Sequence, residues 1–132
     1  MTAPGHARAT VDAPDAPAAI GPYSHAVRCG GVVYCSGQLP LRPGDGTLVD
    51  DSLAVATRLC LDNLAAVCHA AGTSLSRAVR LTIYTTELEG FAEINGAYAA
   101  YFEADPPARA AVGVAALPKG ARVEIDAIVA SD

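Results

Sequence analysis

Two segments with apolar residues at helical spacing, separated by segments of strand character, constrain the fold of this chain more than any other feature. Over residues 53–71 apolar side chains recur every three or four positions, which predicts an amphipathic helix of about five turns. Ser52 is a suitable N-cap for this helix, and Gly72 is a suitable residue to end it. A second helical pattern runs from Phe91 to Phe102, just before two prolines.

The remaining ordered segments favour β-strands. Residues Tyr23 to Cys29 and Val32 to Ser36 flank the pair Gly30-Gly31, which is typical of a β-hairpin. Three further strands are expected at residues 79–84, 108–117 and 122–130. The first and last of these alternate apolar and polar residues, as in half-buried strands. A turn at 118–120 separates the last two.

The expected order is therefore ββ-α-β-α-β-β, in which both helices have one apolar face for the same side of a sheet. This order favours a two-layer α+β sandwich. The other face of the sheet is also rather apolar, with residues such as Val32, Tyr34 and Ala111. A patch of this kind is large for a monomer, so we expect oligomerisation to cover it.

Length and composition favour one ordered domain over residues 18–132, preceded by a flexible arm at residues 1–17 that is rich in Ala, Pro and Asp. Hydrophobic residues make up 52% of the 132-residue chain and charged residues 17%, which excludes disorder. The net charge of −5 argues against a nucleic-acid partner. No apolar run approaches the roughly 18 residues of a membrane span, and no signal peptide is evident.

The four cysteines, at positions 29, 35, 60 and 68, have no zinc-like spacing, so no metal site is expected. We expect them to be reduced thiols of a cytoplasmic protein, mostly in the core. Cys35 is the cysteine of most interest because of its neighbours, in Cys35-Ser36-Gly37-Gln38. Phosphate-binding glycine loops and the G-x-S-x-G motif are absent, and the single lysine, Lys119, lies in a turn.

Charged residues are few, so their positions are informative. Arg109 opens a strand of Ala, Val and Gly, where it either reaches solvent or lines an apolar pocket and binds a carboxylate. Glu124 and Asp126 share one face of the last strand and are either solvated or, near such a pocket, able to act as a general base. In a simple hairpin of the last two strands, Arg109 and Glu124 would lie on the order of 16 Å apart. Another topology, or a subunit boundary, would be needed to join them.

Several motifs, in this order along residues 18–130, resemble the RidA (YjgF) family. They are Ala18-Ala19-Ile20-Gly21-Pro22-Tyr23-Ser24, Ser36-Gly37-Gln38, Pro107-Ala108-Arg109, Val114-Ala115-Ala116-Leu117-Pro118-Lys119-Gly120 and Val123-Glu124-Ile125. The resemblance implies a chorismate-mutase-like fold with a mixed sheet, and a homotrimer with sites between subunits. It also implies hydrolysis of enamine and imine intermediates, such as 2-aminoacrylate and 2-iminopropionate, to 2-keto acids and ammonia without a cofactor. The implied partners are a small imino or keto acid and other copies of the chain.

By the same resemblance, Arg109 matches the arginine that binds the substrate carboxylate, and Glu124 matches the acid that activates water. Four further positions match residues near the pocket: Tyr23, Ser36, Asn95 and the backbone carbonyl of Ala111. The family commonly has Gln where this chain has His25. This histidine is either a tolerated substitution or a functional residue that tunes or obstructs the pocket, or donates a proton to the leaving group. Tyr23 and His25 are two apart and should point the same way.

Three other functions remain open at this stage. The chain could be a non-catalytic ligand-binding or regulatory trimer that uses Arg109 to hold a keto acid. It could be a pathway-specific deaminase or isomerase for a larger substrate. Nucleic-acid cleavage, a further activity associated with the family, is disfavoured by the acidic charge balance.

Overall fold

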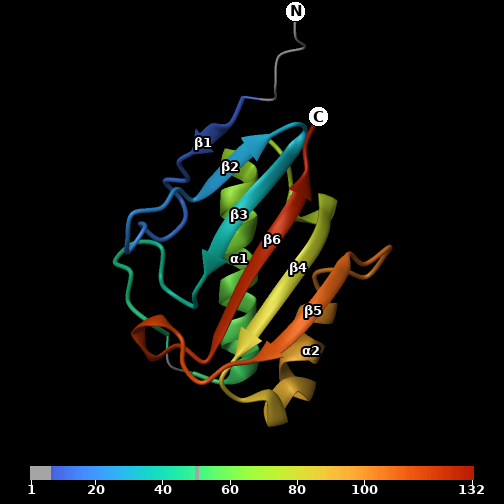
Figure 1. Cartoon of the computed structure of the whole chain (residues 1–132). Helices are drawn as coiled ribbons and strands as arrows, with labels where there is room; N and C mark the ends of the chain where they lie inside the picture. Colours follow the sequence, from blue (N-terminus) through green and yellow to red (C-terminus); the bar gives the residue numbers. More distant parts are fainter. Residues whose placement is uncertain (1–6, 50) are drawn as a thin grey trace, which may run out of the picture.

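The computed structural model describes residues 7–49 and 51–132 of the chain. A six-stranded mixed sheet forms one layer, with strand order β1-β2-β3-β6-β4-β5 (Figure 1). The strands are β1 (Ala9–Val11), β2 (Ala26–Cys29), β3 (Val32–Gln38), β4 (Ala78–Thr85), β5 (Ala108–Gly113) and β6 (Val123–Ala130). The helices are α1 (Leu53–Ala70) and α2 (Phe91–Ala99), with short 3-10 turns η1 (Leu75–Arg77), η2 (Leu88–Gly90) and η3 (Pro118–Gly120).

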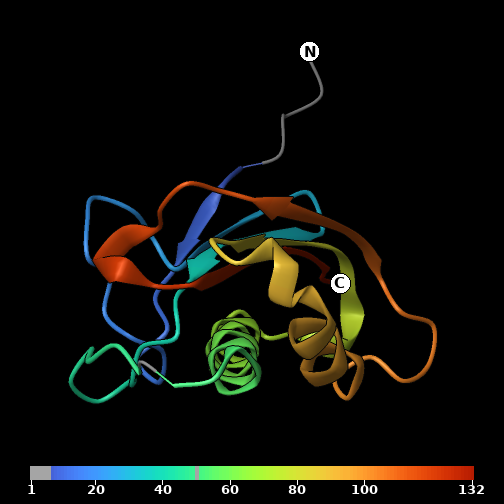
Figure 2. The same cartoon turned by 90° about the horizontal axis from the view of Figure 1, so that it is seen from below.

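Both helices pack on the same face of the sheet, as Figure 2 shows from below. The core lies between the two layers and is built from aliphatic side chains of the helices and the central strands. Its fully buried members include Leu61, Leu64, Leu81, Ile83, Ile94 and Ile125. The predicted two-layer α+β sandwich is therefore confirmed. The strands' other face has no helix over it.

Helix α1 begins and ends as its sequence predicts. The Ser52 side chain accepts a hydrogen bond from the Val55 amide, and Gly72 adopts a left-handed φ of 81° just after the helix. The buried Asn63 amide donates to the carbonyls of Leu39 and Leu41, which ties the loop after β3 to the helix. By length and composition alone α1 could cross a membrane; here, half of that stretch is buried against the rest of the domain.

Strand β6 lies in the middle of the sheet, between β3 and β4, and runs antiparallel to both. Strand β5 pairs only with β4, in parallel, and forms the sheet edge. A direct hairpin between β5 and β6 is thus excluded, although the two are consecutive in the chain. This arrangement decides where Arg109 and Glu124 can lie.

Three predicted elements are clearly shorter than their sequence patterns. Strand β2 begins at Ala26 rather than at Tyr23, since its ladder with β3 begins with the pair Ala26 and Cys35. Strand β5 ends at Gly113 rather than at residue 117, because its partner β4 ends at Thr85 and offers no further ladder. Helix α2 ends at Ala99 rather than Phe102, since the amides of Tyr101 and Phe102 bond back three residues, not four.

The prediction of a flexible arm over residues 1–17 is wrong for its second half. Strand β1 pairs antiparallel with β2, and Val11, Ala13 and Ala16 are buried. Small apolar side chains in this segment pack onto the core, which its Ala- and Pro-rich composition concealed. Residues 1–6 lie outside the described residues.

Candidate functional site

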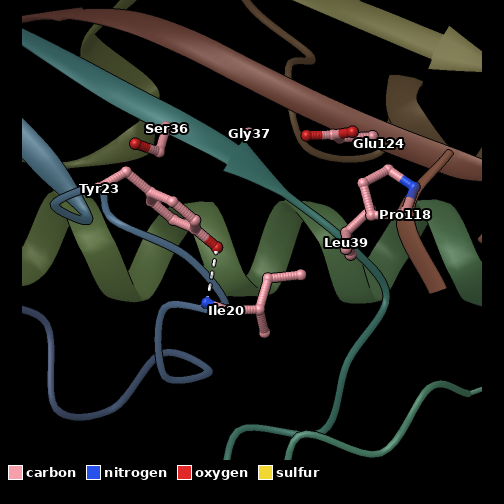
Figure 3. A pocket seen from close by; sticks show the side chains of 7 residues that line it. All are labelled: Ile20, Tyr23, Ser36, Gly37, Leu39, Pro118 and Glu124. Carbon is pink, nitrogen blue, oxygen red and sulfur yellow. Dashed lines mark hydrogen bonds between the residues drawn. The ribbon is translucent and has the colours of Figure 1, made fainter.

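One surface hollow, of about 270 Å³, surrounds the side chain of Glu124. It is lined by Ile20, Tyr23, Ser36, Gly37, Leu39, Pro118 and Glu124 (Figure 3). These residues come from the loop before β2, the end of β3, η3 and β6. Three sequence-predicted site residues, Tyr23, Ser36 and Glu124, are therefore brought together. Glu124 is the only ionisable carboxylate or base in the lining.

A shift in strand register brings Ser36 and Gly37 to this hollow. Cys35 pairs with Ala127 and Gln38 with Ile125, so β3 carries one extra residue over this step. The Ser36 hydroxyl donates to the Ser24 carbonyl at 2.6 Å. Its oxygen lone pairs remain able to accept a hydrogen bond from a ligand.

Tyr23 is held by its own loop. The Ile20 amide donates to the Tyr23 hydroxyl oxygen at 3.1 Å, as the dashed line in Figure 3 shows. The phenol proton is not used in that bond, so the hydroxyl can donate to a ligand. The ring is 43% exposed, which leaves one side of the hollow open to anything that docks there.

The carboxylate of Glu124 is in an unfavourable place for a negative charge. Burial raises its pKa above the ordinary value, and repulsion by Asp126 adds to the rise. No residue in the described ranges donates a hydrogen bond to it. Asp126, by contrast, accepts a hydrogen bond from the Tyr84 hydroxyl at 3.1 Å and does not line the hollow. Of the two acids on β6, only Glu124 lines this hollow.

A second hollow, of about 470 Å³, lies beside α2 and contains Arg109 and Asn95. The Arg109 guanidinium donates to the Asn95 side-chain oxygen at 2.8 Å. It also lies 5.2 Å from the ring centre of Phe91 and 4.9 Å from that of Tyr98. Two aromatic rings and one amide therefore fix the direction of the guanidinium and leave other N–H groups for an anion.

Arg109 and Glu124 do not meet within one chain. Arg109 is opposite Leu81 on β4, whose side chain is buried under the helices, whereas Glu124 is opposite Tyr84 on the uncovered face. The two residues are also two strands apart, which is about 10 Å across the sheet. Along β4, their partners are three residues apart, which is about another 10 Å. Ala111 lies on edge strand β5, two residues beyond Arg109, and lines neither hollow.

His25 is buried and does not line the Glu124 hollow. Its Nδ1 accepts a hydrogen bond from the Ala13 amide at 3.0 Å, and its Nε2 lies 2.8 Å from the Pro17 carbonyl. With Nδ1 accepting from the amide, Nε2 carries a proton and donates it to the Pro17 carbonyl. His25 shares a different hollow with Tyr23 and residues near β1. Its observed contacts fasten the N-terminal segment to β2.

The cysteines supply no nucleophile to the site, and the described residues supply no metal-binding cluster. Cys35 is buried, and a hydrogen bond with Cys68 together with burial raises the pKa of its thiol, so it is a poor nucleophile. Within residues 7–49 and 51–132, no group of three His, Cys, Asp or Glu side chains is placed to hold a metal ion.

Sequence reasoning missed several residues of the two hollows. Phe91 and Tyr98 were assigned to the apolar face of the second helix, yet their rings also stack on Arg109. Their spacing with Asn95, four and then three residues, was the available signal for a shared helix face. Ile20, Leu39 and Pro118 gave no such signal, because they come from three separate loops.

Fold and geometry together define a class of protein: a small α+β domain with an uncovered sheet face and two separate hollows, one with an acidic and one with a basic side chain. The family model described as "Endoribonuclease L-PSP" matches residues 13–131. The chain therefore belongs to this family, which is also the RidA (YjgF) family.

Three relatives illustrate the similarity. A bovine (Bos taurus) protein named 2-iminobutanoate/2-iminopropanoate deaminase is 43% identical over 121 residues, covering 92% of this chain and 88% of its own. The crystal structure of RidA from the Antarctic bacterium Psychrobacter is 42% identical, with a TM-score of 0.88, and covers 92% and 98% of the two chains. The Escherichia coli protein TdcF, solved with bound serine, is 37% identical, with a TM-score of 0.87 and coverages of 94% and 99%.

Proposed function

We propose that this protein is a hydrolase that converts 2-imino acids, formed from reactive enamine intermediates, into 2-keto acids and ammonia. One observation carries the proposal: a carboxylate with a raised pKa, to which none of the described residues donates a hydrogen bond, stands in a hollow with few polar groups. Such a group is suited to take a proton from water near neutral pH. The relative named as an iminobutanoate and iminopropanoate deaminase supports the same chemistry.

The mechanism needs no nucleophilic side chain. Glu124 removes a proton from a water molecule as the water oxygen attacks the electrophilic imine carbon, which forms a tetrahedral carbinolamine. Glu124 passes this proton to the imine nitrogen, then takes the hydroxyl proton of the carbinolamine and passes it to the nitrogen as well. Ammonia leaves as the carbon–nitrogen bond breaks and the carbon–oxygen double bond of the keto acid forms. Arg109 binds the substrate carboxylate through parallel hydrogen bonds and so orients the imine carbon. Tyr23 and Ser36 line the pocket beside it.

We propose that the working unit is a homotrimer in which Arg109 of one copy faces Glu124 of the next. The opposite orientations of the two side chains support this, because only a second copy can bring the two together. The uncovered sheet face also exposes Tyr34 and Val112, apolar groups that a second copy would bury. Ala111, at the edge strand beside Arg109, would then offer its backbone near the imine nitrogen.

Small, uncharged side chains fit the Glu124 hollow best. Ile20, Leu39 and Pro118 provide its apolar walls, and its volume of about 270 Å³ holds a few carbon atoms beyond the reacting centre. An acidic side chain would meet the negative charge of Glu124. A relative solved with bound serine, a small α-amino acid, supports this class of ligand.

A trapping assay tests the proposal. An amino-acid oxidase generates imines from several amino acids, and semicarbazide converts them to a semicarbazone that absorbs light. We expect the wild-type protein to suppress trapping, most strongly for imines with small apolar side chains, and Arg109→Ala and Glu124→Gln to suppress it at least about a hundred-fold less. Unchanged trapping across the panel would overturn imine hydrolysis.

The same preparations distinguish the two other functions. Tight binding of a 2-keto acid by calorimetry, without any turnover of imines, would identify a ligand-binding protein instead. Cleavage of RNA that depends on Glu124 would identify a nuclease, as the description of the family model suggests. The net charge of −5 argues against that outcome.

A further inference from the structure

Residue 37 is a glycine, and the Glu124 carboxylate lies in the space that a side chain at this position would fill. A Cβ atom built on Gly37 would overlap Oε2 of Glu124, and it would lie 3.0 Å from Cδ and 3.2 Å from Cγ. Carbon atoms at van der Waals contact are about 3.5 to 4.0 Å apart. Figure 3 shows Gly37 between Ser36 and Glu124 on the wall of the hollow. Any side chain at this position must displace the carboxylate.

Backbone conformation does not explain why glycine is needed here. Several glycines of this chain have a left-handed φ, such as Gly30 at 61° and Gly72 at 81°, whereas Gly37 does not. Alanine at position 37 is therefore compatible with the local backbone. The feature specific to Gly37 is the absence of a side chain next to Glu124.

The position of the carboxylate depends on this free space because little else holds it. The described residues donate no hydrogen bond to Glu124, and the nearby Asp126 repels it. From these contacts we infer that Gly37 is a positioning residue for the general base: its missing side chain admits the Glu124 carboxylate to the place from which it reaches the attacking water. The inference rests on the proposed function, in which Glu124 is that base.

The predicted defect is catalytic rather than structural. The atoms that a Cβ would overlap belong to the free end of a flexible side chain, so Glu124 can move while the strands stay in register. A base must lie within hydrogen-bond distance of the water, and a misplacement of about 1 Å can cost on the order of 10²-fold in rate. The groups that bind substrate, Arg109 and Tyr23, are not touched by the change.

The experiment compares Gly37→Ala with the matched control Gly44→Ala, whose added Cβ would meet nothing within 4 Å. We expect Gly37→Ala to lower kcat by about ten- to a hundred-fold, with KM changed by less than about two-fold. The melting temperature and oligomeric state should match those of Gly44→Ala. A loss of folding stability alone would not produce this split between kcat and KM.

A double substitution separates positioning from other causes. Aspartate is one methylene shorter than glutamate, so its carboxylate withdraws from the space above position 37. We expect Gly37→Ala to lower kcat by less than about three-fold when Glu124→Asp is already present. The effects of the two substitutions on kcat would then be clearly non-additive. An equal loss in both backgrounds, or wild-type kcat for Gly37→Ala, would overturn the inference.

A crystal structure of Gly37→Ala provides a readout that is independent of turnover. We expect a displaced Glu124 carboxylate and unchanged strands β3 and β6. An unmoved carboxylate would overturn the inference even if activity fell. If the wild-type protein hydrolyses no imine, the proposed function fails, and this structure still decides whether position 37 determines where the carboxylate lies.

Discussion

At the scale of single residues, Glu124 combines a functional position with an energetic disadvantage. Burial and the neighbouring Asp126 raise its pKa, which means that the folded state disfavours its charged form relative to the unfolded chain. Its ionisation therefore destabilises the fold at neutral pH. This penalty disappears as the pH falls through the raised pKa, because the carboxyl group is then neutral in the folded state.

Glu124→Gln should accordingly be more stable than the wild type at pH 7 while losing activity. The neutral amide keeps the size of the side chain and removes the buried charge, as is common when an active-site group is neutralised. Thermal unfolding at pH 7 and at pH 4 measures the difference, which should shrink at the lower pH. A lower melting temperature at pH 7 would contradict the prediction.

Asp126→Asn should move the acid side of the pH–activity profile to lower pH. Repulsion by Asp126 raises the pKa of Glu124, so removing that charge lets Glu124 ionise at a lower pH. The profile of kcat/KM reports the pKa of the free enzyme's base. Asp126 lies outside the hollow, and the asparagine side chain can still accept the Tyr84 hydrogen bond, so folding should be retained. An acid limb that stays in place or moves up would contradict the assignment of Glu124 as the base.

At the scale of elements, His25 fastens strand β1 and the segment after it. Its two ring nitrogens pair with the backbone of Ala13 and Pro17, on either side of the turn at Pro14 and Asp15. His25→Ala leaves both backbone groups without these partners, and we expect a loss of about 1 to 3 kcal/mol. Hydrogen exchange should show faster exchange in β1 with little change in β6.

The control for this prediction is His69→Ala, which changes an exposed side chain in the last turn of α1. It should change stability by no more than about 1 kcal/mol and leave the exchange of β1 unaltered. Imine hydrolysis should survive in both variants, because His25 does not line the Glu124 hollow. Loss of turnover in a well-folded His25→Ala protein would instead make this histidine part of the site.

The elements themselves were largely predictable, because their signals are local. Helix α1 has its apolar stripe and both capping residues in consecutive sequence, and Gly30-Gly31 identifies the first hairpin. The strand order, by contrast, has no local signal in the sequence. Strand β6 lies between β3 and β4, and nothing in residues 108–130 distinguishes this order from a simple hairpin of β5 and β6. Likewise, the resemblance to a known family assigned roles to Arg109 and Glu124. The role of Gly37 could be inferred only from the structure, because it depends on the space next to Glu124 that has no side chain in it.

At the scale of the whole molecule, Arg109 and Glu124 face opposite sides of one sheet. Arg109 lies on the side covered by helices, at the edge strand, and Glu124 lies on the uncovered side. The uncovered face also carries exposed apolar groups, such as Tyr34. Association of copies through this face would bury apolar surface and complete the site in one step, so that stability and activity would depend on the same contacts.

Mixing two inactive variants should restore activity if the site is shared between copies. In a trimer assembled from Arg109→Ala and Glu124→Gln subunits, a native pair forms wherever the intact Arg109 of the second meets the intact Glu124 of the first. Random assembly from equal amounts gives about a quarter of the interfaces this pairing, hence about a quarter of wild-type activity. The variants should be refolded together, and native mass spectrometry should confirm that mixed trimers form.

The control is a mixture of Glu124→Gln with the double variant Arg109→Ala/Glu124→Gln, which contains no intact Glu124 and should stay inactive. If the first mixture also stays inactive although mixed trimers are present, Arg109 and Glu124 do not act across a subunit boundary. Because the sheet holds the two side chains on opposite faces within one chain, that result would leave no arrangement in which they share a substrate. Imine hydrolysis by this pair of residues would then have to be abandoned, whatever activity the wild-type protein shows.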